Sequence, residues 1–216
     1  MNRSTAAMED LDNYRVTSES SIRLLEEELT TTSVMDMYPM LEANKMTSEI
    51  SGMTMENYTV GDMVYTKGLD GSWMKMKIPS EGTGEEPGAD FTPMTDAEYA
   101  EYFVMEETAE GYRVKTKRPI TMEEMQRIGN IPQEETDMPG LGEEETDLTV
   151  ELDMLISRDY YTSEMVMTMI MATDEGTVES VINTTMSHFN ELPPFQLPAE
   201  AEEAEEVEIP GMPMMP

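Results

Sequence analysis

Hydrophobic residues recur at every second position in several segments of the chain, and this period of two is the pattern of a half-buried β-strand. In the first such segment, Tyr14, Val16 and Ile22 share one parity, while polar and charged residues dominate the other. One long strand is therefore predicted over residues 14–24. The pattern resumes over residues 41–78, where glycines recur at intervals that suit tight turns, so four short antiparallel strands are predicted there.

The alternation returns in the last third of the chain. Residues 148–156, 165–172 and 177–189 are each predicted to be a strand, and together they predict an antiparallel meander. In the middle strand, the segment "MVMTMIM" places a methionine at every second position from Met165 to Met171. We expect the methionines of this strand and the aliphatic residues of the strand before it to face the same side of the sheet.

Helices are predicted between and after these groups of strands. Residues 95–104 and 121–129 each begin with a threonine followed three positions later by a glutamate, which is the sequence of a capping box. Between them, "GYRVKTKRP" at residues 111–119 predicts a strand. Near the end, Pro198 stands where the first residue of a short helix is expected, ahead of an acidic tail rich in methionine and proline.

Charge narrows the classes of function. The 216 residues include 46 acidic and 13 basic ones, and the formal net charge is −33, which repels nucleic acid and anionic membrane surfaces. Self-repulsion of this size is screened by salt, which fits a saline habitat or an exposed location, although a very soluble acidic domain would show the same excess. The chain has no cysteine, so disulfides, thiolate metal sites and cysteine nucleophiles are excluded.

The methionine strand allows three interpretations. Thioethers bind Cu(I), but neighbours on one face of a strand stand about 7 Å apart, and His188 is the one histidine that could join them. Methionine is also a flexible filler of ordinary cores. As the wall of a pocket, the same flexible side chains can repack around ligands of varied shape, and we favour this interpretation.

The candidate cavity-lining residues lie on the methionine strand, on the strand that ends near residue 78, and on the two helices expected to cover them. They are Met74, Met76, Ile78, Tyr102, Phe103, Met122, Met125, Met165, Met167, Met169 and Met171. Trp73 has the opposite parity from Met74, so it is expected either on the other face, beside Lys75 and Lys77, or beneath a loop. The sequence contains no nucleophile elbow, phosphate loop or metalloprotease helix, so no catalytic residue, metal or cofactor is expected.

Three segments, in their order along the chain, carry a resemblance to a known family: "LEANKM", "ENYTVGDMVYTKGLDGSWMKM" and "FNELPPFQLPAEAEEA". They resemble the LolA-like lipoprotein-carrier superfamily, which includes the LppX/LprG lipoproteins. The resemblance implies an α+β fold, a strongly curved antiparallel half-barrel whose concave apolar face is covered by two or three helices and holds acyl chains. It also implies one domain over residues 1–198, followed by the helix and tail of residues 199–216.

The expected function is therefore non-enzymatic binding or carriage of a lipid or other hydrophobic molecule, by a monomer at the cell envelope. Members of the superfamily often carry a secretion signal and a lipidated cysteine, neither of which occurs in this chain, so tethering to a membrane would depend on a leader outside it. Two alternatives stay open. One is an extracellular structural or interaction module with a solid, methionine-rich core, and the other is the handling of Cu(I).

Overall fold

The structure, a computed structural model, describes residues 3–24, 27–78, 101–121, 124–125, 148–173 and 176–207. The chain forms two compact units. Unit 1 comprises Met1–Asp10, Ser18–Thr31 and Thr92–Met186, and unit 2 comprises Leu11–Thr17, Thr32–Phe91 and Ser187–Pro216. Two long strands, β1 (Tyr14–Leu24) and β2 (Glu27–Tyr38), contribute residues to both units. Strand β1 confirms the strand predicted over residues 14–24.

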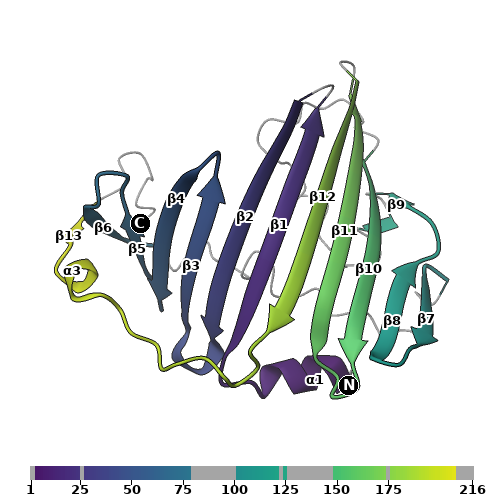
Figure 1. Cartoon of the computed structure of the whole chain (residues 1–216), viewed down its shortest axis with the longest axis horizontal. Helices are drawn as coiled ribbons and strands as arrows, with labels where there is room; N and C mark the ends of the chain where they lie inside the picture. The colour runs from purple at the N-terminus through teal and green to yellow at the C-terminus, as the bar shows by residue number, and fades with distance from the viewer. Residues whose placement is uncertain are drawn as a thin grey trace, which may run out of the picture. The chain divides into compact units, whose positions relative to one another are not determined.

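Unit 2 is built on an antiparallel meander, in which each strand pairs with the next along the chain. Its elements are η1 (Pro39–Leu41), β3 (Ala43–Ile50), β4 (Met53–Val60), β5 (Met63–Lys67), β6 (Trp73–Lys77), α3 (Ala199–Glu202) and β13 (Glu205–Glu206), which pairs parallel to β6. Two of the turns contain Gly52 and Gly71, whose φ angles of 79° and 83° lie in a region that glycine adopts without strain. The four strands predicted over residues 41–78 are confirmed (Figure 1).

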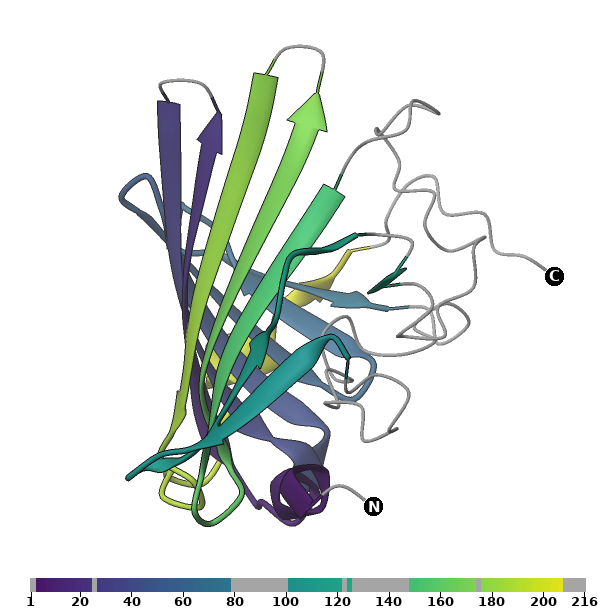
Figure 2. The ribbon, with the colours of Figure 1, turned by 90° about the vertical axis from the view of Figure 1, so that its right-hand side faces the viewer.

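Unit 1 contains the long strands of the last third of the chain, which lie side by side (Figure 2). Its elements are α1 (Arg3–Glu9), β7 (Phe103–Glu107), β8 (Gly111–Thr116), β9 (Ile120–Thr121), β10 (Leu148–Ser157), β11 (Thr162–Thr173) and β12 (Gly176–Ser187). Strand β10 pairs antiparallel with β11 and with both β8 and β9, and β11 pairs antiparallel with β12. The predicted meander and the strand predicted within residues 111–119 are therefore confirmed.

Among the described residues, the strands follow the order β13-β6-β5-β4-β3-β2-β1-β12-β11-β10-β8-β7, with β9 beside β10. The described chain is thus a large antiparallel sheet with few helices, which agrees with the predicted class. Strong curvature and the covering of one face by helices stay predictions. No helix within the described ranges is long and apolar enough to cross a membrane.

Two segments differ from the prediction. Residues 27–38 form β2, which the pattern did not predict because threonine and serine occupy both parities of "TTTSVMDMY" and obscure the period of two. The helix predicted over residues 95–104 is wrong at its end, since Phe103 begins β7. There, pairing with Thr116 of β8 outweighs the local helix signal. Residues 95–100 lie outside the described residues.

The second capping box is present. The backbone N–H of Glu124 donates to Thr121 Oγ1 over 3.3 Å, and the backbone N–H of Thr121 donates to Glu124 Oε2 over 3.1 Å. Two hydrogen bonds from Arg118, together with that of Thr121, lower the pKa of Glu124 to about 2. Glu124 and Met125 are helical, and the other residues of the helix predicted after Thr121 lie outside the described part of the chain. Helix α3 begins one residue later than expected, because Pro198 is its N-cap.

Candidate hydrophobic-ligand site

Strands β10 and β11 place two rows of apolar side chains opposite one another. Residues directly opposite in an antiparallel pair point to the same face of the sheet. The register pairs Leu148 with Met171, Val150 with Met169, Leu152 with Met167, and Met154 with Met165. The prediction that the methionines of β11 share a face with the aliphatic residues of β10 is confirmed.

The neighbouring strands continue this face on both sides, with apolar residues on β8 and with apolar residues alternating with Ser180 and Thr184 on β12. On β8, Val114 lies opposite Met154 and Tyr112 opposite Ile156, and on β12, Ile182 lies opposite Met167. The residues of this surface, called here the methionine face, are Tyr112, Val114, Ile120, Leu148, Val150, Leu152, Met154, Ile156, Met165, Met167, Met169, Met171, Val178 and Ile182.

On the methionine face, the apolar row of β10 is more deeply buried than the row of methionines on β11. On β10, Leu152, Met154 and Ile156 form a buried cluster, against which Phe103 and Met165 pack, among others. The methionines of β11 are only partly buried. The β10 row therefore belongs to the core, while the β11 row still presents apolar surface that a ligand could cover.

The opposite face of the same strands is mixed, because ion pairs lie on it beside aliphatic residues such as Val166 and Ile170. Arg113 donates two hydrogen bonds of 2.7 Å to the carboxylate of Asp153, and Lys115 Nζ lies 3.2 Å from it. The hydrogen bonds from Arg113 are the main cause that lowers the pKa of Asp153. Further along this face, Arg23 pairs with Glu179 over 3.3 Å. The ion pairs of β8, β10, β11 and β12 are confined to this face, so the methionine face is the one on which the described residues of these strands carry no ion pair.

Several predicted site residues come together in unit 1. Tyr102 and Ile120 form a second buried cluster, against which Phe103 and Met125 pack, and Phe103 also packs against the β10 cluster. Seven of the predicted residues are thus associated with the methionine face: Tyr102, Phe103, Met125, Met165, Met167, Met169 and Met171. Met122 lies outside the described residues. Sequence reasoning missed Tyr112 and Val114, although both alternate within a strand that it predicted.

The remaining predicted residues lie in unit 2. Met74 and Met76 of β6 pair with Thr66 and Val64, and Met74 is 41% exposed. Ile78 follows the end of β6. These pairs define one face of the unit 2 sheet.

Trp73 alternates with Met74 and lies on the other face, one of the two positions predicted for it. Its ring packs edge-on against Tyr58, with 5.7 Å between the ring centroids. Lys67 Nζ lies 5.6 Å from the centre of the Trp73 ring. The side chain therefore belongs to an aromatic cluster of unit 2.

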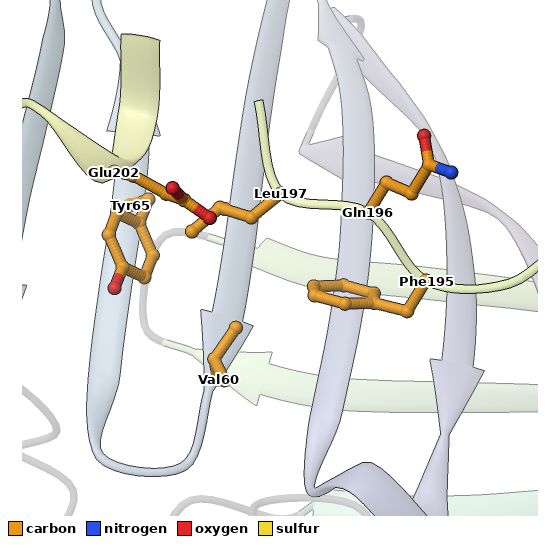
Figure 3. Close-up of a pocket in the computed structure, with 6 residues that line it drawn as sticks. All are labelled: Val60, Tyr65, Phe195, Gln196, Leu197 and Glu202. Carbon is orange, nitrogen blue, oxygen red and sulfur yellow. The ribbon is translucent and has the colours of Figure 1, made fainter. Parts of the chain in front are cut away.

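The face of Trp73 in unit 2 is hollowed by a pocket of ≈ 700 Å³ (Figure 3). Strands β4 and β5 contribute one side, and the segment that leads into α3 contributes the other. None of the predicted cavity-lining residues is among those that line it, which are Val60, Tyr65, Phe195, Gln196, Leu197 and Glu202. In addition, no group of three or more His, Cys, Asp or Glu residues in the described ranges could hold a metal ion.

Comparison with solved structures identifies the class of fold. The structure is similar to the crystal structure of the Mycobacterium tuberculosis lipoprotein LppX, with a TM-score of 0.50 and 12% sequence identity over 89% of this chain and 93% of that chain. A DUF1329 family protein from Desulfovibrio piger matches with a TM-score of 0.31 and 6% identity over 86% of this chain and 90% of its own, too distantly to support an argument. The resemblance to the LppX/LolA-like superfamily is confirmed at the level of the fold.

The sequence also identifies a family. The chain belongs to DUF6612, a family of unknown function, whose model matches residues 1–206. No curated protein matches the sequence.

Proposed function

We propose that this protein binds a lipid or another hydrophobic molecule on the methionine face of unit 1, and that it does so at the cell envelope without catalysing a reaction. The observation that carries the proposal is the row Met165, Met167, Met169 and Met171, which lies in register with the buried row of β10 and is still partly exposed. Covering apolar surface of this kind is favourable by about 25 cal/mol per Å².

The dimensions of the methionine face suit an extended hydrocarbon chain. From Leu148 to Ile156 the β10 row is about 26 Å long, at roughly 3.3 Å per residue. The hydrocarbon core of a whole bilayer is about 30 Å thick, so one acyl chain of ordinary length can lie along this row. Unbranched methionine side chains can adjust to ligands of different shape.

The resemblance to lipoprotein carriers supports the same proposal. Members of that superfamily hold acyl chains on the apolar face of such a sheet, and LppX, whose fold this chain shares, is a lipoprotein. Envelope location, attachment through an N-terminal lipid anchor and a monomeric state are parts of the proposal. Mass spectrometry of the native protein's N-terminus and sedimentation of the purified protein test these parts.

Binding is tested with two adjacent residues of β11 that face opposite sides. Met169→Gln places a polar amide on the methionine face, and Ile170→Gln is the matched control on the other face, where Ile170 is 37% exposed. An unpaired polar group in an apolar site costs about 1 to 3 kcal/mol. Met169→Gln should therefore weaken the binding of a fluorescent fatty acid, measured by fluorescence titration, about fivefold or more. The control should bind as the wild type does.

A filling substitution separates a binding surface from a solid core. If Met167 faces ligand, Met167→Trp should reduce fatty-acid uptake and leave the free energy of unfolding nearly unchanged. In a solid core the same change would overpack the interior at a cost of about 1 to 3 kcal/mol. Loss of stability in this variant, together with a wild-type protein that carries no extractable lipid and binds no probe, would refute the proposal in favour of a structural module.

A further inference from the structure

Four of the six residues that line the pocket of unit 2 are aliphatic or aromatic. Val60 and the ring of Tyr65 come from β4 and β5, and Figure 3 shows the Phe195 ring and the Leu197 side chain extending toward them from the opposite side. The volume of ≈ 700 Å³ lies within the range of about 300 to 1,000 Å³ that is typical of small-molecule sites. The pocket can therefore take the apolar body of a small molecule.

The segment that forms the pocket is anchored on both sides of it. Tyr38 Oη donates to the carbonyl of Pro193 over 2.9 Å, and the Phe195 ring packs edge-on against Tyr38, with 5.3 Å between centroids. Beyond the pocket, Ala201 is fully buried, and the backbone N–H of Val207 donates to the carbonyl of Lys75 over 2.8 Å. These contacts hold the segment in place before a ligand binds, so binding does not carry the entropic cost of ordering this wall of the pocket.

The lining carries one carboxylate, that of the exposed Glu202, and the cationic Lys75 lies directly opposite the lining residue Tyr65 on the neighbouring strand. Glu202 is the one ionisable acid or base among the lining residues apart from the Tyr65 phenol. Lys75 Nζ donates to the backbone carbonyl of Glu202 over 3.2 Å, and in the part of the chain that the structure describes no cationic side chain forms an ion pair with the Glu202 carboxylate. Because Lys75 bonds to the backbone carbonyl of Glu202 and not to its carboxylate, the carboxylate is available to a second cation that enters the pocket.

The aromatic rings of the pocket and the electrostatic field of the whole protein both favour a positively charged ligand. The faces of aromatic rings such as Tyr65 and Phe195 attract ammonium groups. A protein with a net charge of −33 concentrates cations near its surface and repels anions. We infer that the pocket lined by Val60, Tyr65, Phe195, Leu197 and Glu202 binds a small molecule that joins an ammonium group to an apolar body.

Three probes of one size and different charge test this inference. Isothermal titration calorimetry with 2-phenylethylammonium should show saturable binding, while uncharged 2-phenylethanol should bind about tenfold more weakly or worse, and phenylacetate should not bind, because a charge-assisted contact is worth about this factor. Trp73 is the chain's one tryptophan and contacts Tyr58, which packs against Phe195, so its fluorescence gives a second readout.

Matched variants locate the binding. Glu202→Gln keeps the shape of the side chain and should weaken binding of the ammonium probe about tenfold, to the level of the alcohol. Glu200→Gln changes a carboxylate of the same helix that is exposed, as Glu202 is, but does not line the pocket, and it should bind within about twofold of the wild type. Met169→Gln in unit 1 should leave this binding unchanged, so the outcome is independent of the lipid proposal.

Three results would overturn the inference: no saturable binding of any of the three probes, equal binding of the ammonium and the alcohol, or equal losses in the Glu202→Gln and Glu200→Gln variants. The last result would mean that the cation is attracted by the diffuse negative charge of the protein. Far-UV circular dichroism of each variant checks that the fold is retained.

Discussion

Leu152 of β10 lies directly opposite Met167 of β11, yet the two side chains differ in burial. Leu152 is 9% exposed and belongs to the buried cluster of unit 1, whereas Met167 packs against that cluster from the partly exposed row. A single cross-strand pair thus joins the core of the sheet to the surface proposed to bind ligand.

The first prediction follows from this difference. Leu152→Ala should lower the free energy of unfolding by about 2 to 5 kcal/mol, because it leaves a cavity inside a packed cluster. Met167→Ala should cost distinctly less, because its side chain keeps part of its surface outside the core. Urea unfolding curves of the two variants measure both values. Equal losses would show that β11 is as much a part of the solid core as β10.

The second prediction concerns Gly111, at the start of β8. A Cβ atom built at this position would lie 1.9 Å from the carbonyl oxygen of Ile156, which is backbone and cannot turn aside. Gly111→Ala should therefore destabilise unit 1 severely, by more than about 3 kcal/mol, or prevent it from folding.

Gly52→Ala is the control for this change. Its turn is strained for alanine at φ 79°, but no atom lies within 4 Å of the added carbon. The expected cost is about 1 kcal/mol. Thermal melts compare the two variants, and a mild effect of Gly111→Ala would contradict the tight packing of the hairpin on β10.

The third prediction concerns pH and Asp153. The hydrogen bonds from Arg113 and Lys115 lower the pKa of Asp153 in the folded state. Its contribution to stability is therefore complete above the unfolded pKa of about 3.9 and is lost as pH falls through the lower folded pKa. Because the pair is partly exposed, the contribution should stay below about 1 kcal/mol.

Asp153→Asn measures that contribution. The variant should be less stable than the wild type at pH 6, and the difference should shrink at pH 3 and below. Urea midpoints at several pH values measure it, with Glu151→Gln, an exposed acid on the same strand and face, as the control. A difference between Asp153→Asn and wild type that is constant with pH would show that the effect is not ionic.

Local signals in the sequence determined most of the strands and one capping box. Alternation over residues 14–24 and 148–156 survives in the structure because side chains on a strand point to opposite faces, whatever the strand pairs with. The capping box of Thr121 and Glu124 is present because it is closed by atoms three residues apart. The shared face of the β10 and β11 rows also follows from parity, once the two strands pair.

The tertiary structure alone determined the conformation of segments whose local sequence signal was weak or pointed to a different structure. Strand β2 exists because neighbours on both sides pair with it, although threonines obscure its pattern. Phe103 begins a strand because β8 is beside it, against its helix-like sequence context. The pocket joins Val60 and Tyr65 to Phe195 and Glu202, more than a hundred residues later. Contacts between residues so far apart in the sequence depend on how the chain returns to the sheet. The hydrophobic periodicity of a short segment does not predict that path.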